Sequence, residues 1–222
     1  MRLMDLSSKI VLISGPTSSG KSNFAVLLAK KIHGEIINAD SMQVYKELKI
    51  LTARPKTKEF KSIKNHLYGF QSVKKNFSTG NWLKLVIKKI NEVKKRKKIP
   101  IIVGGTGLYF RALTDGLVKI PIIPNNYRNK IRNLQKNIGQ EKFYKKLITL
   151  DPSLKKIIRS TDIQRSIRAY EVKSYTKKSL THWFKNTKNI FSDKDFFKIY
   201  IDYQRPELVE RISKRTDRDD KT

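Results

Sequence analysis

The sequence predicts an α/β fold, in which a parallel β-sheet is flanked by helices and is joined to a small inserted all-helical domain. The first observation is an apolar run at residues 9–14, followed by a helical pattern at 21–33 and a second apolar run at 35–39. This strand–helix–strand order implies a parallel sheet that is buried on both faces. The second observation is that the apolar residues from 127 to 188 follow only helical spacing.

The core elements follow from apolar periodicity and from turn residues between the periodic segments. In chain order, they are a strand at 9–14, a helix at 21–33 that Gly34 ends, a strand at 35–39, a loop-rich stretch at 46–80, a helix over 82–93, a strand at 100–105, a strand at 196–202 and a helix at 206–215.

The helical insertion begins after a stretch punctuated by prolines, "VKIPIIPNN", within residues 117–126. We therefore divide the chain into an α/β core, formed by 1–116 and 189–218, and a helical domain at 117–188. Residues 219–222 end a purely polar stretch, "RTDRDDKT", and are expected to form a frayed tail.

The net charge indicates the kind of partner. The chain has 49 Lys and Arg against 19 Asp and Glu, which gives a formal charge of +30. A field of this sign attracts nucleic acid or an anionic membrane surface. A proteome-wide bias toward lysine, as in an AT-rich genome, is an alternative source of part of this excess. However, like charges repel one another and destabilise the compact state.

The composition also excludes several classes of site. There are no cysteines, so disulfides and thiolate metal sites are excluded. The first apolar run leads into a glycine-rich loop and not into a cleavage site for a signal peptide. The apolar stretches are shorter than the roughly 18 residues that a membrane span needs. We expect a soluble cytoplasmic protein with no membrane partner.

The stretch "GPTSSGKS" matches the phosphate-binding pattern G-x-x-x-x-G-K-[ST] between a strand and a helix. Gly15 and Gly20 let the backbone amides turn inward, and the helix N-terminus adds partial positive charge. Lys21 supplies a mobile cation, and the Ser22 hydroxyl is a candidate Mg²⁺ ligand. The fold is therefore predicted to be P-loop NTPase-like, but the loop alone does not show whether its ligand is a nucleotide or another diphosphate.

Asp40 follows the second predicted strand, at the end of the sheet where ligands bind in α/β folds. It stands in the polar stretch "ADSMQVY", whereas the strand "PIIVGG" carries no acid of the kind that holds Mg²⁺ in many nucleotide hydrolases. Asp40 is placed to accept a proton from a nucleophile beside the bound diphosphate. A helix N-cap is the structural alternative for this residue.

Two further stretches are candidates for nucleic-acid contact. Thr106 lies in "GGTGLY", where a glycine turn with a helix cap is an equally good interpretation. The stretch "TDIQRSIRAYEV" places Gln164, Arg165 and Arg168 within about one turn, with Ile163 expected on the opposite face. Gln and Arg suit phosphates and base edges, although a solvated helix face is the simpler alternative.

Together these stretches resemble the tRNA dimethylallyltransferase family, also called tRNA isopentenyltransferases. The matching segments, from about residue 9 to 215, are "GPTSSGKS", "INADSMQVYKELKILTARP", "NHLYGF", "FSTGNW", "PIIVGGTGLYFRALTDGL", "DIQRSIRAYEV" and "RPELVERISKR". The resemblance implies transfer of a dimethylallyl group from dimethylallyl diphosphate to N6 of adenosine 37 in tRNA, with Mg²⁺ as cofactor and a monomeric enzyme.

The resemblance also implies a role for particular positions. The implied catalytic residues are Asp40, Lys21 and Arg215. Diphosphate binding is implied for Gly15, Pro16, Thr17, Ser18, Ser19, Gly20, Lys21, Ser22 and Arg211, with Ser22 on the metal. Contact with tRNA is implied for Asp40, Ser41, Met42, Gln43, Thr106, Arg128, Gln164, Arg165, Ser166, Ile167 and Arg168.

Members of this family continue beyond the segment that matches "RISKR", so the resemblance predicts a C-terminally shortened chain. Two alternatives to an active transferase follow. One is a tRNA-binding remnant with impaired catalysis. The other is a P-loop small-molecule kinase, which would not explain the charge of +30 or the Gln–Arg–Arg stretch.

Overall fold

The computed structural model describes residues 6–55, 60, 62–185, 187 and 189–219, and they form two compact units. Unit 1 contains Met1–Asp115 and Asn189–Thr222, and unit 2 contains Gly116–Lys188. The two junctions between the units lie within one residue of those that the sequence suggests, whereas the sequence interpretation ended the core at residue 218. Each unit has its own apolar core, so each is described separately.

Unit 1 is built on a five-stranded sheet in the order β3-β2-β4-β1-β5, and all its pairs are parallel. The strands are β1 (Ile10–Ser14), β2 (Gly34–Asn38), β3 (Asn65–His66), β4 (Ile99–Gly104) and β5 (Phe196–Tyr200). This confirms the predicted α/β class and four of the strands. The two-residue β3 was missed, because it lies inside the stretch predicted as loop.

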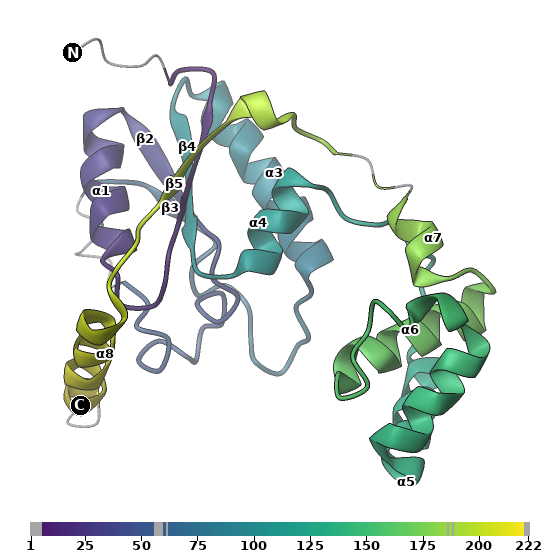
Figure 1. Cartoon of the computed structure of the whole chain (residues 1–222). Helices are drawn as coiled ribbons and strands as arrows, with labels where there is room; N and C mark the ends of the chain where they lie inside the picture. The colour runs from purple at the N-terminus through teal and green to yellow at the C-terminus, as the bar shows by residue number, and fades with distance from the viewer. Residues whose placement is uncertain (1–5, 56–59, 61, 186, 188, 220–222) are drawn as a thin grey trace. The chain divides into compact units, whose positions relative to one another are not determined.

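Helices α1 (Lys21–Lys31) on one face and α3 (Thr79–Lys95) and α4 (Gly107–Thr114) on the other cover this sheet, whereas α8 (Arg205–Asp219) lies beyond the end of β5 (Figure 1). Unit 1 also has a 3₁₀ turn at Asp193–Asp195. Successive strand residues point to opposite faces. Val11 and Ile101 accordingly pack with Ala25 of α1, whereas the indole nitrogen of Trp82 of α3 donates to the Asn38 carbonyl at 2.9 Å.

The turn between α1 and β2 differs from the prediction. Helix α1 ends at Lys31, two residues before the predicted end, and the residue with a left-handed backbone after it is His33 (φ 53°) and not Gly34. Gly34 instead begins β2, where a Cβ would lie 2.6 Å from a methyl carbon of Ile101. A glycine is therefore required here by packing between β2 and β4, and not by the turn.

Unit 2 is entirely helical among its described residues. It contains α5 (Asn125–Leu150), the 3₁₀ turn Pro152–Leu154, α6 (Ile163–Thr176) and α7 (Leu180–Phe184). Gly139 is non-helical (φ 75°, ψ 164°) and kinks α5 between its two apolar segments. The core of the unit is formed by α5, the turn and α6 through Leu147, Leu154, Ile158 and Ala169. In the described part of the chain, no helix has the length and apolarity to cross a membrane.

The C-terminal helix is longer than the sequence suggested. Helix α8 continues through Arg215 to Asp219, so the polar stretch "RTDRD" extends the helix and is not a frayed end. Residues 220–222 of the predicted tail lie outside the described residues.

Candidate active site

The glycine-rich loop joins β1 to α1 in the expected way. Gly20 is the N-cap residue of α1 and has a left-handed backbone (φ 82°), which a residue with a side chain adopts at a cost. Lys21 follows in the first turn, and its ammonium donates to the Pro16 carbonyl. The Ser19 side chain is buried, yet its hydroxyl has no hydrogen-bond partner among the described residues. A buried hydroxyl of this kind is satisfied when a ligand supplies an acceptor.

Asp40 lies directly beyond β2. Its carboxylate Oδ1 accepts hydrogen bonds from the amides of Met42 at 2.9 Å and Gln43 at 3.3 Å. Its own amide donates to the Asn38 side chain at 2.9 Å. Asp40 therefore caps a turn, which is related to the helix cap considered from the sequence. Its second oxygen, Oδ2, makes no hydrogen bond with any residue that the structure describes.

The end of β4 holds the Asp40 segment in place. At Gly104 a Cβ would lie 2.2 Å from the backbone of Ala39, so only glycine lets the two strand ends approach this closely. The Thr106 hydroxyl accepts from the Ser41 amide at 2.9 Å and lies 3.2 Å from the Ser41 hydroxyl. Thr106 is also the N-cap residue of α4. In this structure Thr106 fixes the position of Ser41.

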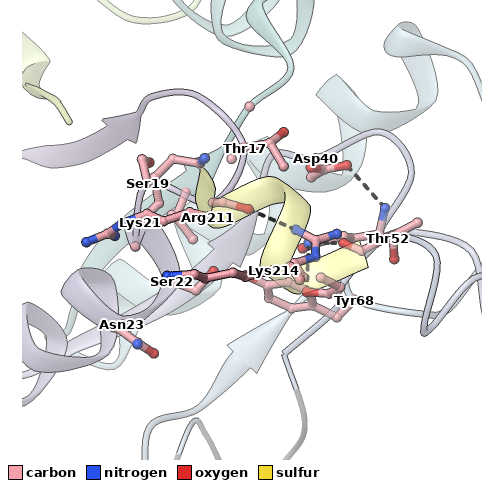
Figure 2. Close-up of a pocket in the computed structure, with 18 residues that line it drawn as sticks. Thr17, Ser19, Lys21, Ser22, Asn23, Asp40, Thr52, Tyr68, Arg211 and Lys214 are labelled. Atoms are coloured by element: carbon pink, nitrogen blue, oxygen red, sulfur yellow. Dashed lines mark hydrogen bonds between the residues drawn. The ribbon is translucent and has the colours of Figure 1, made fainter. Parts of the chain in front are cut away.

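Helix α8 brings three cations to the loop. Arg211, Lys214 and Arg215 line the same cavity as Lys21 and Asp40, and Figure 2 shows the labelled members of this group around it. The cavity has a volume of about 630 Å³. An Arg215 guanidinium nitrogen donates to the Ser18 hydroxyl at 3.4 Å, and the Arg211 guanidinium lies 4.3 Å from the centre of the Tyr203 ring. The loop and α8 thus enclose a strongly cationic space.

The cavity places one carboxylate among these cations, and this affects its neighbours. Burial lowers the pKa of Lys21, and the negative charge of Asp40 acts in the opposite direction. Burial likewise raises the pKa of Tyr68, and Asp40 adds to this shift. Asp40 and Lys21 therefore interact electrostatically across one cavity, as the sequence interpretation required of them.

Several lining residues were not predicted. Asn23, Thr52, Ala53, Tyr68, Val103, Gly104, Gly105 and Lys214 complete the wall. The side-chain nitrogen of Gln43, Nε2, donates to the Thr52 carbonyl at 2.9 Å and lies 3.4 Å from the Ala53 carbonyl. These contacts connect the loop that carries Thr52 to the Asp40 turn. The stretches "TARP" and "NHLYGF" matched the family pattern, but no function was predicted for their side chains.

Among the described residues, no three His, Cys, Asp or Glu side chains gather as a metal site. The oxygen donors near the loop are instead hydroxyls and one carboxylate. The Ser22 hydroxyl lies in the first turn of α1, and both Ser22 and Asp40 line the cavity. Mg²⁺ is commonly held by one or two protein oxygens together with substrate phosphates and water. The donor set fits that pattern.

The predicted tRNA residues of unit 2 fall into two groups. Gln164 and Arg165 are exposed at the start of α6, where they line a shallow hollow with Arg159, Thr161, Asp162 and Ile163. Arg165 lies 3.4 Å from Asp162, the N-cap residue of the helix. Arg128 and Arg168 both approach the buried Glu171, for which no function was predicted from the sequence.

Two expectations for α6 are corrected. Ser166 was expected to contact tRNA, but it is fully buried and its hydroxyl accepts from the Gln140 side chain at 3.2 Å. Ile163 was expected on the packed face, but 42% of it is exposed. Ile167 is partly buried. The spacing shows which residues share a face, but not how the helix is rotated against its neighbours.

Comparison with known proteins gives a consistent result. The family model described as IPP transferase matches residues 43–219. A tRNA dimethylallyltransferase from Pelagibacter ubique is 63% identical over 96% of this chain and 68% of its own length. A protein of the same name from Parvibaculum lavamentivorans is 41% identical over 94% of this chain and 66% of its own length. The chain thus spans about two thirds of the length of these relatives.

Solved structures are similar as well. A eukaryotic dimethylallyltransferase acting on tRNA superposes with a TM-score of 0.81 at 27% identity, and the match covers 95% of this chain and 52% of the other. A tRNA isopentenylpyrophosphate transferase from Bacillus halodurans gives a TM-score of 0.61 at 28% identity, over 96% of this chain and 66% of the other.

Proposed function

Because the chain belongs to the IPP transferase family, whose members include the tRNA dimethylallyltransferases, we propose that it transfers a dimethylallyl group from dimethylallyl diphosphate to N6 of adenosine 37 in tRNA. The observation that carries the proposal is the cavity itself, where a phosphate-binding loop and three cations of α8 face a single carboxylate with one open oxygen. This arrangement suits alkylation of an amine with loss of diphosphate.

The diphosphate end of the donor binds at the loop. The amides around Gly20, the ammonium of Lys21 and the unsatisfied Ser19 hydroxyl supply donors there, and Arg211 and Arg215 supply charge from α8. The Ser22 hydroxyl would hold Mg²⁺ together with the substrate phosphates, and the ion would supply additional charge stabilisation of the diphosphate.

At the allylic carbon, the reaction makes one bond and breaks one, and a proton moves from the amine to a base. The adenine N6 attacks the allylic carbon, and the carbon–oxygen bond to the diphosphate breaks. Negative charge grows on the leaving oxygens, where preorganised cations stabilise it. The amine loses a proton, and Asp40 Oδ2 is placed to accept it while Oδ1 keeps its hydrogen bonds to the turn. No water molecule has to be activated.

The base has to leave its stack to reach the cavity. An anticodon loop makes this easier than a duplex does, because its bases are already partly unstacked. Met42 follows Asp40 by two residues and is half exposed, so its side chain is available to pack against the base. We further propose that the enzyme acts as a cytoplasmic monomer.

The proposal is tested by incubating the purified chain with labelled dimethylallyl diphosphate, Mg²⁺ and an anticodon stem-loop that contains A37. Label should appear in the RNA, and a stem-loop with G at that position should remain unlabelled. RNA binding without transfer at any enzyme concentration would contradict the proposal and support the binding remnant. Transfer of phosphate from ATP to a small molecule would support the kinase. The comparisons lend no support to either alternative.

A further inference from the structure

Glu171 of α6 is a buried carboxylate surrounded by three arginines. Its side chain is 1% exposed. Arg128 and Arg132, one turn apart on α5, approach it through Nε at 3.4 and 3.8 Å, and Arg168, one turn earlier on α6, does so through Nη1 at 3.4 Å. One negative charge therefore serves three positive ones, which leaves a formal excess of two.

This cluster does not satisfy its own polar groups. Among the described residues, neither Glu171 Oε1 nor Arg128 Nε has a hydrogen-bond partner, although both atoms are buried. Only Arg168 makes a hydrogen bond to Glu171 with acceptable geometry. Buried ionic groups that serve structure alone are usually paired and fully bonded. The excess of positive charge indicates that an anion completes the cluster, and such an anion would bond to arginine donors, because Glu171 Oε1 is itself an acceptor.

The exposed parts of the arginines suit a phosphate. The side chains of Arg128, Arg132 and Arg168 are 36%, 50% and 41% exposed. Since Arg128 and Arg132 approach Glu171 through Nε, the two Nη groups of each remain for another acceptor. A guanidinium presents its donors as a rigid planar fork that matches a phosphate group. All three guanidinium groups lie within 3.8 Å of Glu171, so their exposed parts belong to one small area of unit 2.

Without Glu171, three guanidinium groups at this spacing would repel one another. The carboxylate offsets that repulsion and keeps the forks close together before any ligand arrives. Free energy that would otherwise be needed to gather them is then available for binding. The negative charge of Glu171 also weakens the long-range attraction between the protein and RNA. This effect is smaller than the gain from holding the arginines together, because salt screens the field of a single charge within about 8–10 Å.

We infer that Arg128, Arg132 and Arg168 form a subsite for the phosphate backbone of the RNA substrate and that Glu171 is its positioning residue. The inference rests on the proposed function for the identity of the ligand as RNA. It adds Arg132 and Glu171 to the residues considered from the sequence. It also makes an unusual prediction: removing a negative charge from this basic protein weakens its binding to RNA.

The test compares Glu171→Gln with Glu141→Gln in the full chain. Glu141 lies on α5 of the same unit, with its side chain 82% exposed and paired only with Lys145 among the described residues. Both variants gain one positive charge. Binding to a fluorescent anticodon stem-loop is measured across a series of salt concentrations. Glu141→Gln should bind as well as the original protein or slightly better. Glu171→Gln should bind about three- to tenfold more weakly, with a salt slope lower by about one.

Equal affinities for the two variants would overturn the inference. Circular dichroism and a melting curve show whether Glu171→Gln is folded. If Glu171→Gln is not folded, Arg132→Lys tests the inference instead. Position 132 is half exposed, and lysine keeps the positive charge there but lacks the planar guanidinium. This variant should bind several-fold more weakly than Arg111→Lys, a matched change at an arginine 78% exposed on α4 of unit 1. Equal binding by these two would also overturn the inference.

The two proposals fail in different ways. If the original protein binds no stem-loop RNA, then RNA is not its substrate and the proposed function fails. An original protein that binds and modifies RNA, together with Glu171→Gln behaving like Glu141→Gln, would remove only the arginine subsite.

Discussion

The cavity of unit 1 and the arginine cluster of unit 2 share one charge pattern, in which several cations surround a single carboxylate. They differ in the access that the carboxylate has to a ligand. Asp40 is partly exposed and has an oxygen without a hydrogen bond to the described residues. Glu171 is buried beneath its arginines. A carboxylate that faces a cavity can contact the ligand directly, whereas one beneath its arginines acts on a ligand through the cations that it holds in place.

A third carboxylate serves as a reference for both. Glu35 of β2 is buried, and both of its oxygens are bonded. Arg96 donates to Oε1 at 3.0 Å and to Oε2 at 2.7 Å, and His66 Nε2 lies 2.7 Å from Oε2. The chain can therefore satisfy a buried glutamate completely. The incomplete bonding at Glu171 is therefore not general among the buried carboxylates of this chain, although Asp151 Oδ2 also lacks a hydrogen-bond partner among the described residues.

The largest expected effect separates chemistry from binding at Asp40. Asp40→Asn keeps an oxygen for the turn at Met42 but cannot accept the proton of the amine. The single-turnover rate of transfer should fall about 10²- to 10⁴-fold, the usual contribution of a general base. RNA affinity should stay within about twofold. Asp115→Asn, at an exposed carboxylate of the same unit, is the control. Loss of rate and affinity in equal measure would show that Asp40 chiefly maintains the turn.

A smaller effect is expected at Arg165, which is 73% exposed at the edge of the hollow in unit 2. Arg165→Ala should weaken stem-loop binding several-fold and lower the salt slope by about one, since one phosphate contact is lost. The transfer rate at saturating RNA should not change. Arg111→Ala removes an equally exposed arginine from unit 1 and serves as the comparison. If both variants keep the original slope, Arg165 lies away from the RNA.

The first strand–helix–strand unit and the phosphate loop could be predicted because they depend on neighbours in the sequence. The run "KIVLIS", the glycines of the loop and Asp40 after the next strand all lie within one strand–helix–strand unit. Parallel strands place their carboxyl ends at one edge of the sheet, so this local pattern already brings Asp40 near Lys21. The cavity shows the two residues in that relation.

The parts that could not be predicted depend on contacts between distant segments. Tyr68 reaches the cavity through the short strand β3, which has too few residues to show a period. Glu171 meets Arg128 only because α5 packs against α6. Arg96 stands in the run of cations "KKRKK", and nothing in that run indicates its pairing with Glu35. In each case the residue type was plain in the sequence, and its partner was not.

The smallest expected effect tests whether the Glu35 cluster is structural. Burial lowers the pKa of His66 below 6.5, so below that pH the unfolded chain binds a proton more readily than the folded one. Stability should therefore fall as the pH drops through about 6.5. The lowered pKa of Glu35 adds a further loss below about 4.5. His66→Gln should remove the first loss.

Melting temperatures between pH 7.5 and 5.5 measure this difference, which should be on the order of 2 °C. In His66→Gln, the glutamine side-chain amide can still donate to Glu35. The control is His182→Gln, at an exposed histidine of unit 2, which should keep the original dependence of melting temperature on pH. Neither variant should alter RNA affinity, in contrast to Glu171→Gln. Parallel curves for His66→Gln and the original protein would show that another group causes the loss. Weaker RNA binding by His66→Gln would show that a fully bonded buried glutamate also supports recognition, and the distinction between the two buried clusters would then fail.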